Sequence, residues 1–419
     1  MSRNVIDTGL SNGVDADVRR QLERDEDRPV DMTAEGVLRR AEERTGLQDF
    51  GPRDFTDRLG RLLAEVEADD NVWRTAKGAF AERCVVAAAA RLKAKHFLDR
   101  HPEAHELRIE RPIIVVGLPR SGTTHLENLV AADRRLRHLP GYLGSEPVPT
   151  PGEVAGADGV DPRWGRADAR WQALRANPVM EAMHEHSPDH ACSENELQMP
   201  DFASYQWEWV AHLPAWRDAY LAADQTPHFA YAAQMLKAIM VQLPGPQRWL
   251  LKGNCHSEQL RALMNVYPDA TIVMIHRDPV AILQSLLTMR AVPLVRTQKE
   301  LDRRGLATYW ADRVETMLNA FQRDRDLVPS EQLVELTFPS IMADDVGSAG
   351  SILARAGLPV TDACRSDLST YMAHHPRGKH GRVDYNLDRD FGASAEELYD
   401  RFGSYLELHG LVREVGSRA

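Results

Sequence analysis

The predicted fold of this chain depends on the stretch Pro112-Ile-Ile-Val-Val-Gly-Leu-Pro-Arg-Ser-Gly-Thr-Thr124. Its first five residues form a short apolar run of the kind found in a buried parallel strand. The residues after it are compatible with a helix, so residues 117–124 connect a strand to a helix. In that context, successive backbone N–H groups and the helix N-terminus point at one anion, and Gly122 allows close approach of the backbone. We therefore predict that residues 117–124, named here the phosphate loop, bind phosphate; the alternative is a connecting turn without function.

The phosphate loop has the glycine spacing of a nucleotide-triphosphate P-loop without its lysine. A P-loop kinase or ATPase places Lys directly after the second glycine, followed by a Ser or Thr that binds Mg²⁺. Here Thr123 stands at the lysine position, and the cation, Arg120, lies inside the loop. A P-loop-type kinase is therefore an alternative function that lacks its most specific residue.

Further strand and helix patterns follow later in the chain. Buried strands are predicted at 248–251, 270–275 and 333–337, and the helices after them at about 257–266, 280–289 and 341–356. Strands that alternate with helices predict a parallel sheet with helices on both faces. The predicted fold class is thus α/β, with a P-loop-like strand-loop-helix unit.

The first part of the chain is predicted to be helical. The first helix is expected to begin at a capping Asp31 or Thr33, to run to Arg44 and to end at Gly46. A second is expected over 55–66, where apolar residues recur at helical spacing, and a third over about 73–100. We predict that residues 1–110 form a helical N-terminal extension packed on a core domain at 111–419.

An aromatic-rich helical insert is predicted at about 146–245. Five of the eight Trp residues fall between Trp164 and Trp216. One interpretation is a helical subdomain with its own core. The other is a lid that buries an apolar or aromatic acceptor, because ligand pockets favour aromatic walls with a few polar groups.

Composition excludes several classes of function. The 419 residues include 51 Lys+Arg against 62 Asp+Glu, a net charge of −11, which excludes a general nucleic-acid coat or a polybasic membrane binder but allows a local basic pocket. The four cysteines lack CxxC spacing, which argues against a disulfide scaffold or a Cys-rich zinc site. The sequence has no apolar leader and no apolar run of about 18 residues. We expect a cytoplasmic protein without a metal, a nucleic-acid partner or an integral membrane segment.

Three motifs in this order resemble those of the sulfotransferases that use 3′-phosphoadenosine 5′-phosphosulfate (PAPS). Residues 119–124, Pro-Arg-Ser-Gly-Thr-Thr, are similar to the family's Pro-Lys/Arg-Ser-Gly-Thr-Thr loop for the 5′-phosphosulfate. Arg277, Pro279 and Ser285 are similar to its Arg-x-Pro…Ser pattern for the 3′-phosphate, where a guanidinium can bind phosphate bidentately. Residues 376–382 resemble its Gly-x-x-Gly segment that closes over the 3′-phosphate, with a solvated basic loop as the alternative.

The resemblance extends over most of the chain and is strongest to the bacterial, actinobacterial-type branch with a helical N-terminal extension. Phe338 is similar in position to an aromatic residue that contacts adenine, although a core Phe is the alternative. His125 departs from the pattern, because many members have Trp there. The cofactor-binding residues that the resemblance implies are Pro119, Arg120, Ser121, Gly122, Thr123, Thr124, His125, Arg277, Ser285, Phe338, Arg377, Gly378 and Lys379.

The chemistry that the resemblance implies is in-line displacement at sulfur. An acceptor hydroxyl attacks, and adenosine 3′,5′-bisphosphate leaves, with no obligatory metal. Negative charge builds on the sulfuryl and bridging oxygens, so fixed cations should supply much of the catalysis. Arg120 is the first candidate. Lys252, one of only seven lysines, is the second, because it follows a predicted strand at the sheet edge where ligands bind and the family carries Lys there.

A histidine is the first candidate for the base that takes the acceptor proton. His256 lies in the segment Lys252-Gly-Asn-Cys-His256, and a neutral imidazole accepts a proton near physiological pH. Related bacterial sequences often have Lys-Ser-Pro-x-His at this place, whereas Gly253 and Asn254 replace Ser-Pro here. A helix cap or surface group is the alternative role of His256.

Carboxylates are the competing candidates for the base. In relatives a Glu often follows a Trp downstream of the phosphate loop, but this chain has Tyr-Leu at 142–143, and the nearest carboxylate is Glu146. Glu194 and Glu196 fall in a segment that borders the acceptor in relatives. We rank Glu194 after His256, and Glu146 third.

The sequence therefore predicts a PAPS-dependent sulfotransferase that acts on a hydroxyl of a small-molecule or lipid acceptor. The alternatives are the P-loop-type kinase and a catalytically weak nucleotide-binding protein of the same fold. The last is suggested by the altered segment from Lys252 to His256 and by the missing Trp-Glu pair. The aromatic insert favours phenols, sterol-like alcohols or lipid-linked sugars as acceptors, and the sequence indicates no oligomeric state.

Overall fold

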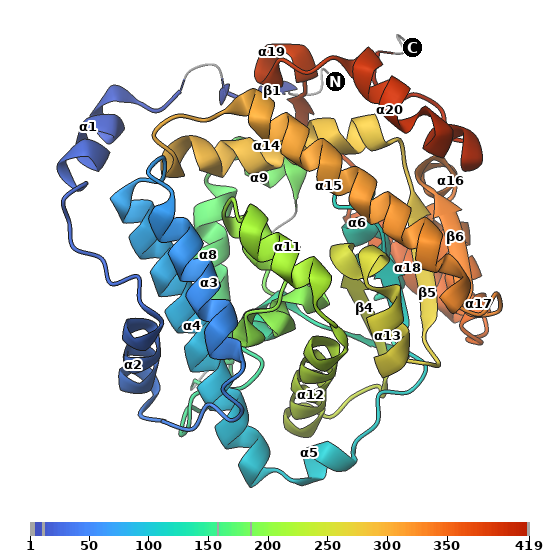
Figure 1. The fold of residues 1–419 in the computed structure, drawn as a ribbon. Coiled ribbons are helices and arrows are strands. Elements are labelled where there is room, and N and C mark those ends of the chain that lie inside the picture. The colour runs from blue at the N-terminus through green and yellow to red at the C-terminus, as the bar shows by residue number, and fades with distance from the viewer. Residues whose placement is uncertain (1–4, 11–12, 157–158, 185–186, 417–419) are drawn as a thin grey trace.

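A five-stranded parallel sheet lies at the centre of the computed structural model, which describes residues 5–10, 13–156, 159–184 and 187–416 (Figure 1). The strand order is β3 (Leu136–His138), β4 (Arg248–Gly253), β2 (Ile113–Val116), β5 (Thr271–His276) and β6 (Leu333–Thr337), and every pairing is parallel. The predicted α/β class is confirmed. β3 was missed because three residues with two polar side chains carry too little strand signal.

Helices cover both faces of the sheet. Alternate side chains of β2 point to opposite faces and pack in different hydrophobic clusters. Ile114 and Val116 pack with α12 (Thr226–Gln242) and α13 (Leu260–Val266). Ile113 and Val115 pack on the opposite face. The helices on that face are α6 (Thr123–Val130), α17 (Asp345–Arg355) and α18 (Asp362–His374).

The expected helices after β5 and β6 differ from the observed ones at their ends. α14 (Pro279–Thr297) extends beyond the expected 280–289. The single helix expected at 341–356 is wrong, because α16 (Phe338–Ala343) ends and the Asp344 carboxylate caps α17 by accepting from the Gly347 N–H. The predicted helix at 257–266 begins as the 3₁₀ helix η3 (Asn254–Glu258) before α13. Within the described ranges, no helix combines the length and apolarity needed to cross a membrane.

The N-terminal helices form where the periodicity predicts them. They are α2 (Ala34–Thr45), α3 (Phe55–Ala68) and α4 (Arg74–Arg100), preceded by α1 (Ala16–Arg24). Thr33 caps α2 through the Gly36 N–H, and Gly46 ends it with a φ of 68°. The helical N-terminal region is confirmed, whereas the boundary between 1–110 and 111–419 stays a prediction.

The aromatic insert shares its core with these N-terminal helices instead of building one of its own. Phe202 stacks on Phe55 of α3, with ring centroids 5.7 Å apart, and on Trp207, 5.5 Å apart. Trp216 and Tyr220 belong to the same cluster. The helical elements of this region are α8 (Pro162–Arg175), α9 (Pro178–Met183), η2 (Glu194–Asp201), α10 (Gln206–Val210) and α11 (Pro214–Ala222).

The start of the described chain packs on its C-terminal part near α19 (Figure 1). β1 (Val5–Asp7) pairs in parallel with β7 (Arg382–Asp384), so a strand from the start of the chain holds the segment that follows residues 376–381. The remaining elements are α5 (Glu103–Glu106), α7 (Gly141–Ser145), α15 (Arg303–Asp324), η4 (Arg325–Leu327), α19 (Leu387–Phe391) and α20 (Ala395–Leu408).

Candidate active site

The site lies at the carboxyl edge of the three central strands, where ligands bind in parallel α/β sheets. The phosphate loop follows β2, residues 253–258 follow β4, and Arg277 follows β5. Since these strands are neighbours in the order β4-β2-β5, three segments distant in sequence lie side by side.

The phosphate loop is held in a conformation that favours glycine. Gly117, Arg120 and Gly122 have φ values of 144°, 71° and 96°. A Cβ on Gly122 would lie 3.1 Å from the Phe338 ring, and the Ser121 hydroxyl donates to the Leu118 carbonyl at 2.7 Å. Ser121 thus fixes the loop from inside, while the first N–H groups of α6 have no intrahelical partners. This is the cradle expected for an anion.

Arg120, Ser285 and Arg277, which the resemblance assigns to one cofactor site, lie together in the structure. The Arg120 Nε donates to the Ser285 hydroxyl at 3.0 Å, and an Arg277 Nη donates to the Arg120 carbonyl at 2.8 Å. Ser285 also bonds to the Tyr385 hydroxyl at 3.1 Å. Burial lowers the pKa of the Arg120 guanidinium, which stays cationic. The structure therefore joins the first and second motifs in one cationic cluster.

The guanidinium of Arg277 is already paired with an oxyanion. Its Nε and Nη2 donate to the two Glu414 carboxylate oxygens at 3.0 and 2.7 Å, and its plane lies 3.9 Å over the centre of the Phe338 ring. The planar fork of Arg277 thus binds a planar anion bidentately in this structure. Phe338, expected beside adenine or in the core, packs between Gly122 and Arg277.

Arg377 of the third motif contacts α16, the helix that begins with Phe338. Arg377 pairs with Asp345 and donates to the Met342 carbonyl at 3.2 Å. The same Asp345 carboxylate bonds to His125 Nε2 at 2.7 Å. Gly378, with a φ of 70°, and Lys379 lie in the turn closed by the Gly381 N–H on the Gly378 carbonyl. Asp345 therefore connects the helix of the phosphate loop to the third motif.

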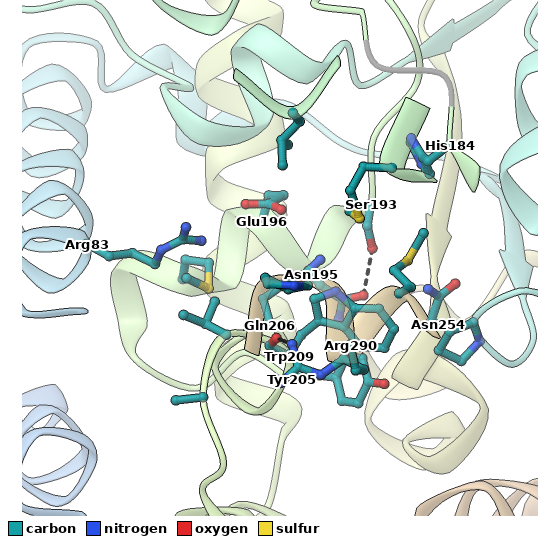
Figure 2. Close-up of a pocket in the computed structure, with 18 of the residues that line it drawn as sticks. Arg83, His184, Ser193, Asn195, Glu196, Tyr205, Gln206, Trp209, Asn254 and Arg290 are labelled. Atoms are coloured by element: carbon teal, nitrogen blue, oxygen red, sulfur yellow. Dashed lines mark hydrogen bonds between the residues drawn. The ribbon is translucent and has the colours of Figure 1, made fainter. Parts of the chain in front are cut away.

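A cavity of about 510 Å³ opens beside the phosphate loop (Figure 2). Pro119, Arg120, Thr123, Thr124, Lys252 and Asn254 line it on the loop side. Aromatic and thioether side chains line much of the rest, among them Trp171, Trp209, Tyr205, Met180, Met199 and Met289. Several of these come from the aromatic insert, as the lid interpretation expects.

Lys252 lies buried at the cavity wall between a hydroxyl and a carboxylate. Its Nζ donates to Thr124 Oγ1 at 3.4 Å and lies 3.7 Å from Glu127 Oε2. Glu127 is fully buried, and neither of its carboxylate oxygens has a hydrogen bond within the described part of the chain. Burial raises the pKa of Glu127 to about 7, although Lys252 acts to lower it. Glu127 was not identified from the sequence. The signal that could have identified it is a carboxylate among the apolar residues directly after the phosphate loop.

Glu127→Gln should change how stability depends on pH. Because the folded-state pKa of Glu127 is raised from 4.5 to about 7, the folded protein keeps a proton that the unfolded chain loses in this window. The free energy of unfolding of the native protein therefore falls as pH rises from 4.5 to 7. The glutamine variant lacks this titration, so it should gain roughly 3 kcal/mol relative to the native protein over the window. Urea unfolding of both proteins at several pH values measures the difference, and a constant difference would contradict the assignment.

His256 and Glu194, the first two candidates for the base, lie together behind the cavity. Both side chains are fully buried, and His256 Nε2 lies 3.1 Å from Glu194 Oε2. The Tyr267 hydroxyl donates to the other Glu194 oxygen at 2.8 Å, and the imidazole packs on Phe229. Gly253 makes this possible, because a Cβ there would lie 2.2 Å from His256 Nε2. The departure from Lys-Ser-Pro thus has a steric reason.

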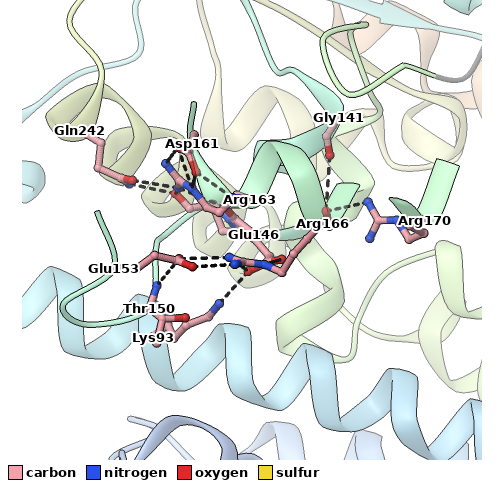
Figure 3. Close-up of polar contacts among 12 residues, drawn as sticks. Lys93, Gly141, Glu146, Thr150, Glu153, Asp161, Arg163, Arg166, Arg170 and Gln242 are labelled. Carbon is pink, nitrogen blue, oxygen red and sulfur yellow. Dashed lines mark hydrogen bonds and ion pairs between the residues drawn. The ribbon is translucent and has the colours of Figure 1, made fainter. Parts of the chain in front are cut away.

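The structure does not bring Glu146, the third candidate, to the cavity. Its carboxylate pairs with Lys93 at 3.1 Å and with Arg166 at 2.9 Å, in a cluster that also holds Glu153 (Figure 3). These two cations hold the pKa of Glu146 below its usual value against burial. Glu196 lines the cavity instead. Glu194 and Glu196 are two residues apart on the 3₁₀ helix η2, so they point to different sides.

A parallel sheet with an anion cradle and convergent arginines at its carboxyl edge defines a P-loop-like α/β protein. The chain belongs to the sulfotransferase family, whose sequence model matches residues 112–362. The fold is similar to that of the sulfotransferase STF9 from Mycobacterium avium, with a TM-score of 0.80, 24% identity, and coverage of 92% of this chain and 98% of that one. It is also similar to the sulfotransferase STF1 from Mycobacterium tuberculosis H37Rv, with a TM-score of 0.77, 25% identity, and coverage of 89% and 98%. A search of curated proteins found no match.

Membership of the family confirms the resemblance seen in the three motifs, and the mycobacterial neighbours agree with the actinobacterial-type branch.

Proposed function

We propose that this protein transfers a sulfuryl group from PAPS to a hydroxyl of a small-molecule or lipid acceptor. The observation that carries the proposal is the convergence of Arg120, Ser285 and Arg277 at the phosphate loop, with Lys252 at the wall of the adjoining cavity. Family membership supports the transferase class. The same membership argues against the P-loop-type kinase, which also lacks its lysine at Thr123.

The residues present fit the two charged ends of this donor. The N–H groups at the start of α6 and Arg120 would hold the 5′-phosphosulfate. Arg277 and Ser285 would hold the 3′-phosphate, and the bidentate contact of Arg277 with Glu414 shows that its fork accepts an oxyanion at this place. Phe338 offers a ring face to adenine, and His125, Arg377, Gly378 and Lys379 are the remaining candidates for contacts with the donor.

Catalysis in this proposal comes from fixed positive charge. Lys252 and Arg120 reach the cavity from two sides of the phosphate loop, so they would stabilise the charge that develops on the sulfuryl and bridging oxygens. Lys252 is buried and Arg120 is half-buried, so their electrostatic stabilisation exceeds its value in water. The cavity walls would hold the acceptor hydroxyl in line with the sulfur.

For the base, we propose a group that faces the cavity. An acceptor hydroxyl must lie within hydrogen-bond reach of the base or one water away. Glu196 and His190 line the cavity, whereas His256 and Glu194 are closed behind it. The buried His256–Glu194 pair would instead fix the segment that carries Lys252 and Asn254.

The test of the proposal is stabilisation by the reaction product. Adenosine 3′,5′-bisphosphate at about 100 times its Kd should add about 2.7 kcal/mol to the stability and raise the Tm by a few degrees. Arg277→Ala should weaken this ligand roughly 30-fold, because a bidentate charged contact is lost. Arg401→Ala, which removes an arginine that pairs with Asp312 and Glu315 and does not line the cavity, is the control.

The alternatives give different results in the same assay. A kinase would be stabilised by Mg²⁺-ATP in preference to the bisphosphate. A catalytically weak binding protein would bind the bisphosphate but show no turnover of PAPS with phenols, sterol-like alcohols or sugars. Absence of any shift with millimolar bisphosphate would refute the proposal.

A further inference from the structure

We propose that the acceptor is an amphiphilic acid: an apolar molecule with its reacting hydroxyl near Lys252 and an anionic group bound by Arg83 across the cavity. This inference rests on the proposed function and deepens it by naming the chemical class of the acceptor. It is carried by the position of Arg83, by its lack of a partner and by the charges along the cavity wall.

Arg83 enters the cavity from α4, on a helix face that is otherwise apolar. Ala76, Ala79 and Phe80 of the same helix line the cavity beside it. Figure 2 shows Arg83 on one side of the pocket and Asn254, which bonds to Thr123 of the phosphate loop at 3.3 Å, on the other. The guanidinium therefore lies across the cavity from the place of sulfuryl transfer.

Arg83 has no hydrogen bond or ion pair with any other residue that the structure describes. Arg83 is exposed to solvent. Desolvation by the protein atoms near its guanidinium lowers its pKa, while Glu196 acts to raise it and Arg170 acts to lower it. A ligand that fills the cavity would displace water from this guanidinium, and an anion on the ligand would replace the lost hydration. Glu196 is too far to pair, so the free fork of Arg83 points to an anion on the ligand.

Charge along the whole cavity supports the same conclusion. Its described lining holds four permanent cations, Arg83, Arg120, Lys252 and Arg290, against the two carboxylates of Asp69 and Glu196. The Arg290 guanidinium is held by Trp209 and Trp310, 5.4 and 5.7 Å from the ring centres, and its Nε lacks a hydrogen-bond partner among the described residues. Arg120 and Lys252 face the sulfuryl donor. Arg83 and Arg290 carry positive charge that would not contact the donor.

The side chains on the rest of the cavity wall indicate the chemistry of the middle part of the ligand. Methionine and tryptophan side chains between the two charged ends favour an apolar body, since such walls bury hydrocarbon and adapt to its shape. A guanidinium binds a planar carboxylate bidentately, and it binds sulfate and phosphate monoesters by the same fork. The ligand chemistry is thus a hydroxyl, an apolar spacer and an oxyanion.

Paired probes test this inference: ω-hydroxy fatty acids of about eight to sixteen carbons, and α,ω-diols of the same lengths, which span the size of such a cavity. Binding to the native protein with bound adenosine 3′,5′-bisphosphate is measured by calorimetry. The best acid should bind roughly tenfold tighter than its matched diol. Arg83→Met should bring the acid to the affinity of the diol and leave the diol unchanged. Arg100→Met, an exposed arginine on the same helix, should keep the preference.

Three results would overturn the inference: equal affinity for acid and diol, a preference that persists in Arg83→Met, or no binding of any acid in the series. Each is independent of the proposed function, because stabilisation of the native protein by the bisphosphate is read first and without the probes. Loss of that stabilisation refutes the sulfuryl donor; loss of the acid preference refutes only the class of acceptor.

Discussion

Lys252→Met is expected to lower the turnover of sulfuryl transfer by roughly 100- to 1000-fold, the range for removing one preorganised charge donor at a reacting oxygen. The ammonium group is held at the cavity wall by Thr124 at 3.4 Å and Glu127 at 3.7 Å. Methionine keeps the length and apolar stem of the side chain but removes the charge. Glu127 would then lose the cation beside it and become protonated, so the variant should fold.

Two measurements separate catalysis from binding in this variant. Turnover with PAPS should fall, while stabilisation by adenosine 3′,5′-bisphosphate should stay close to that of the native protein. Lys237→Met, on α12 and outside the cavity lining, is the matched control and should keep full turnover. Native turnover in Lys252→Met would contradict a catalytic role, and complete loss of bisphosphate binding would assign Lys252 to holding the donor.

Arg313→Met should cost about 3–5 kcal/mol of folding stability, the range for removing one partner of a buried ion pair. The Arg313 guanidinium of α15 donates to Glu208 at 2.7 Å and to both oxygens of Glu258 at 3.0 and 3.1 Å. All three side chains are almost fully buried. The variant leaves two carboxylates in the interior without a countercharge, although the Tyr309 hydroxyl still bonds to Glu208 at 2.6 Å.

Urea unfolding measures this loss of stability, and a surface arginine that also pairs with two carboxylates is the control. Arg401 pairs with Asp312 and Glu315 at exposed positions on α15, so Arg401→Met should cost less than about 1 kcal/mol. Arg313→Lys should recover part of the stability, because one charge remains. If Arg313→Met and Arg401→Met lose the same amount, the buried network does not stabilise the fold as argued. The network also anchors η3, which carries Asn254 at the cavity.

Signals within a single segment were enough to predict most of the fold. Apolar β-branched runs at 112–116 and 270–275 became the central strands β2 and β5, and capping residues placed α2 between Thr33 and Gly46. Segments whose structure depends on distant partners were missed. β1 and β7 are three residues each and exist because they pair across the whole length of the chain.

The candidate site divides in the same way. The phosphate loop was predicted from its place between a strand and a helix, and Arg277 and Ser285 were predicted from the resemblance of a short local motif. The direction of a side chain was harder to predict: Glu194 turns into the interior and Glu196 into the cavity, on a 3₁₀ helix whose phase depends on tertiary packing. Ion pairs between residues distant in the sequence could not be predicted either, such as those of Glu146 with Lys93 and of Arg277 with Glu414.

The pairing of β1 with β7 has a consequence for synthesis on the ribosome. The turn at 376–381 and the bond from Tyr385 to Ser285 belong to a segment held by residues 5–7. Glu414, which orients Arg277, comes later still. A nascent chain can form the central sheet once β6 has emerged, but these contacts form only after residues 382–414 have also left the exit tunnel. The proposed donor site should therefore be completed after the core has folded.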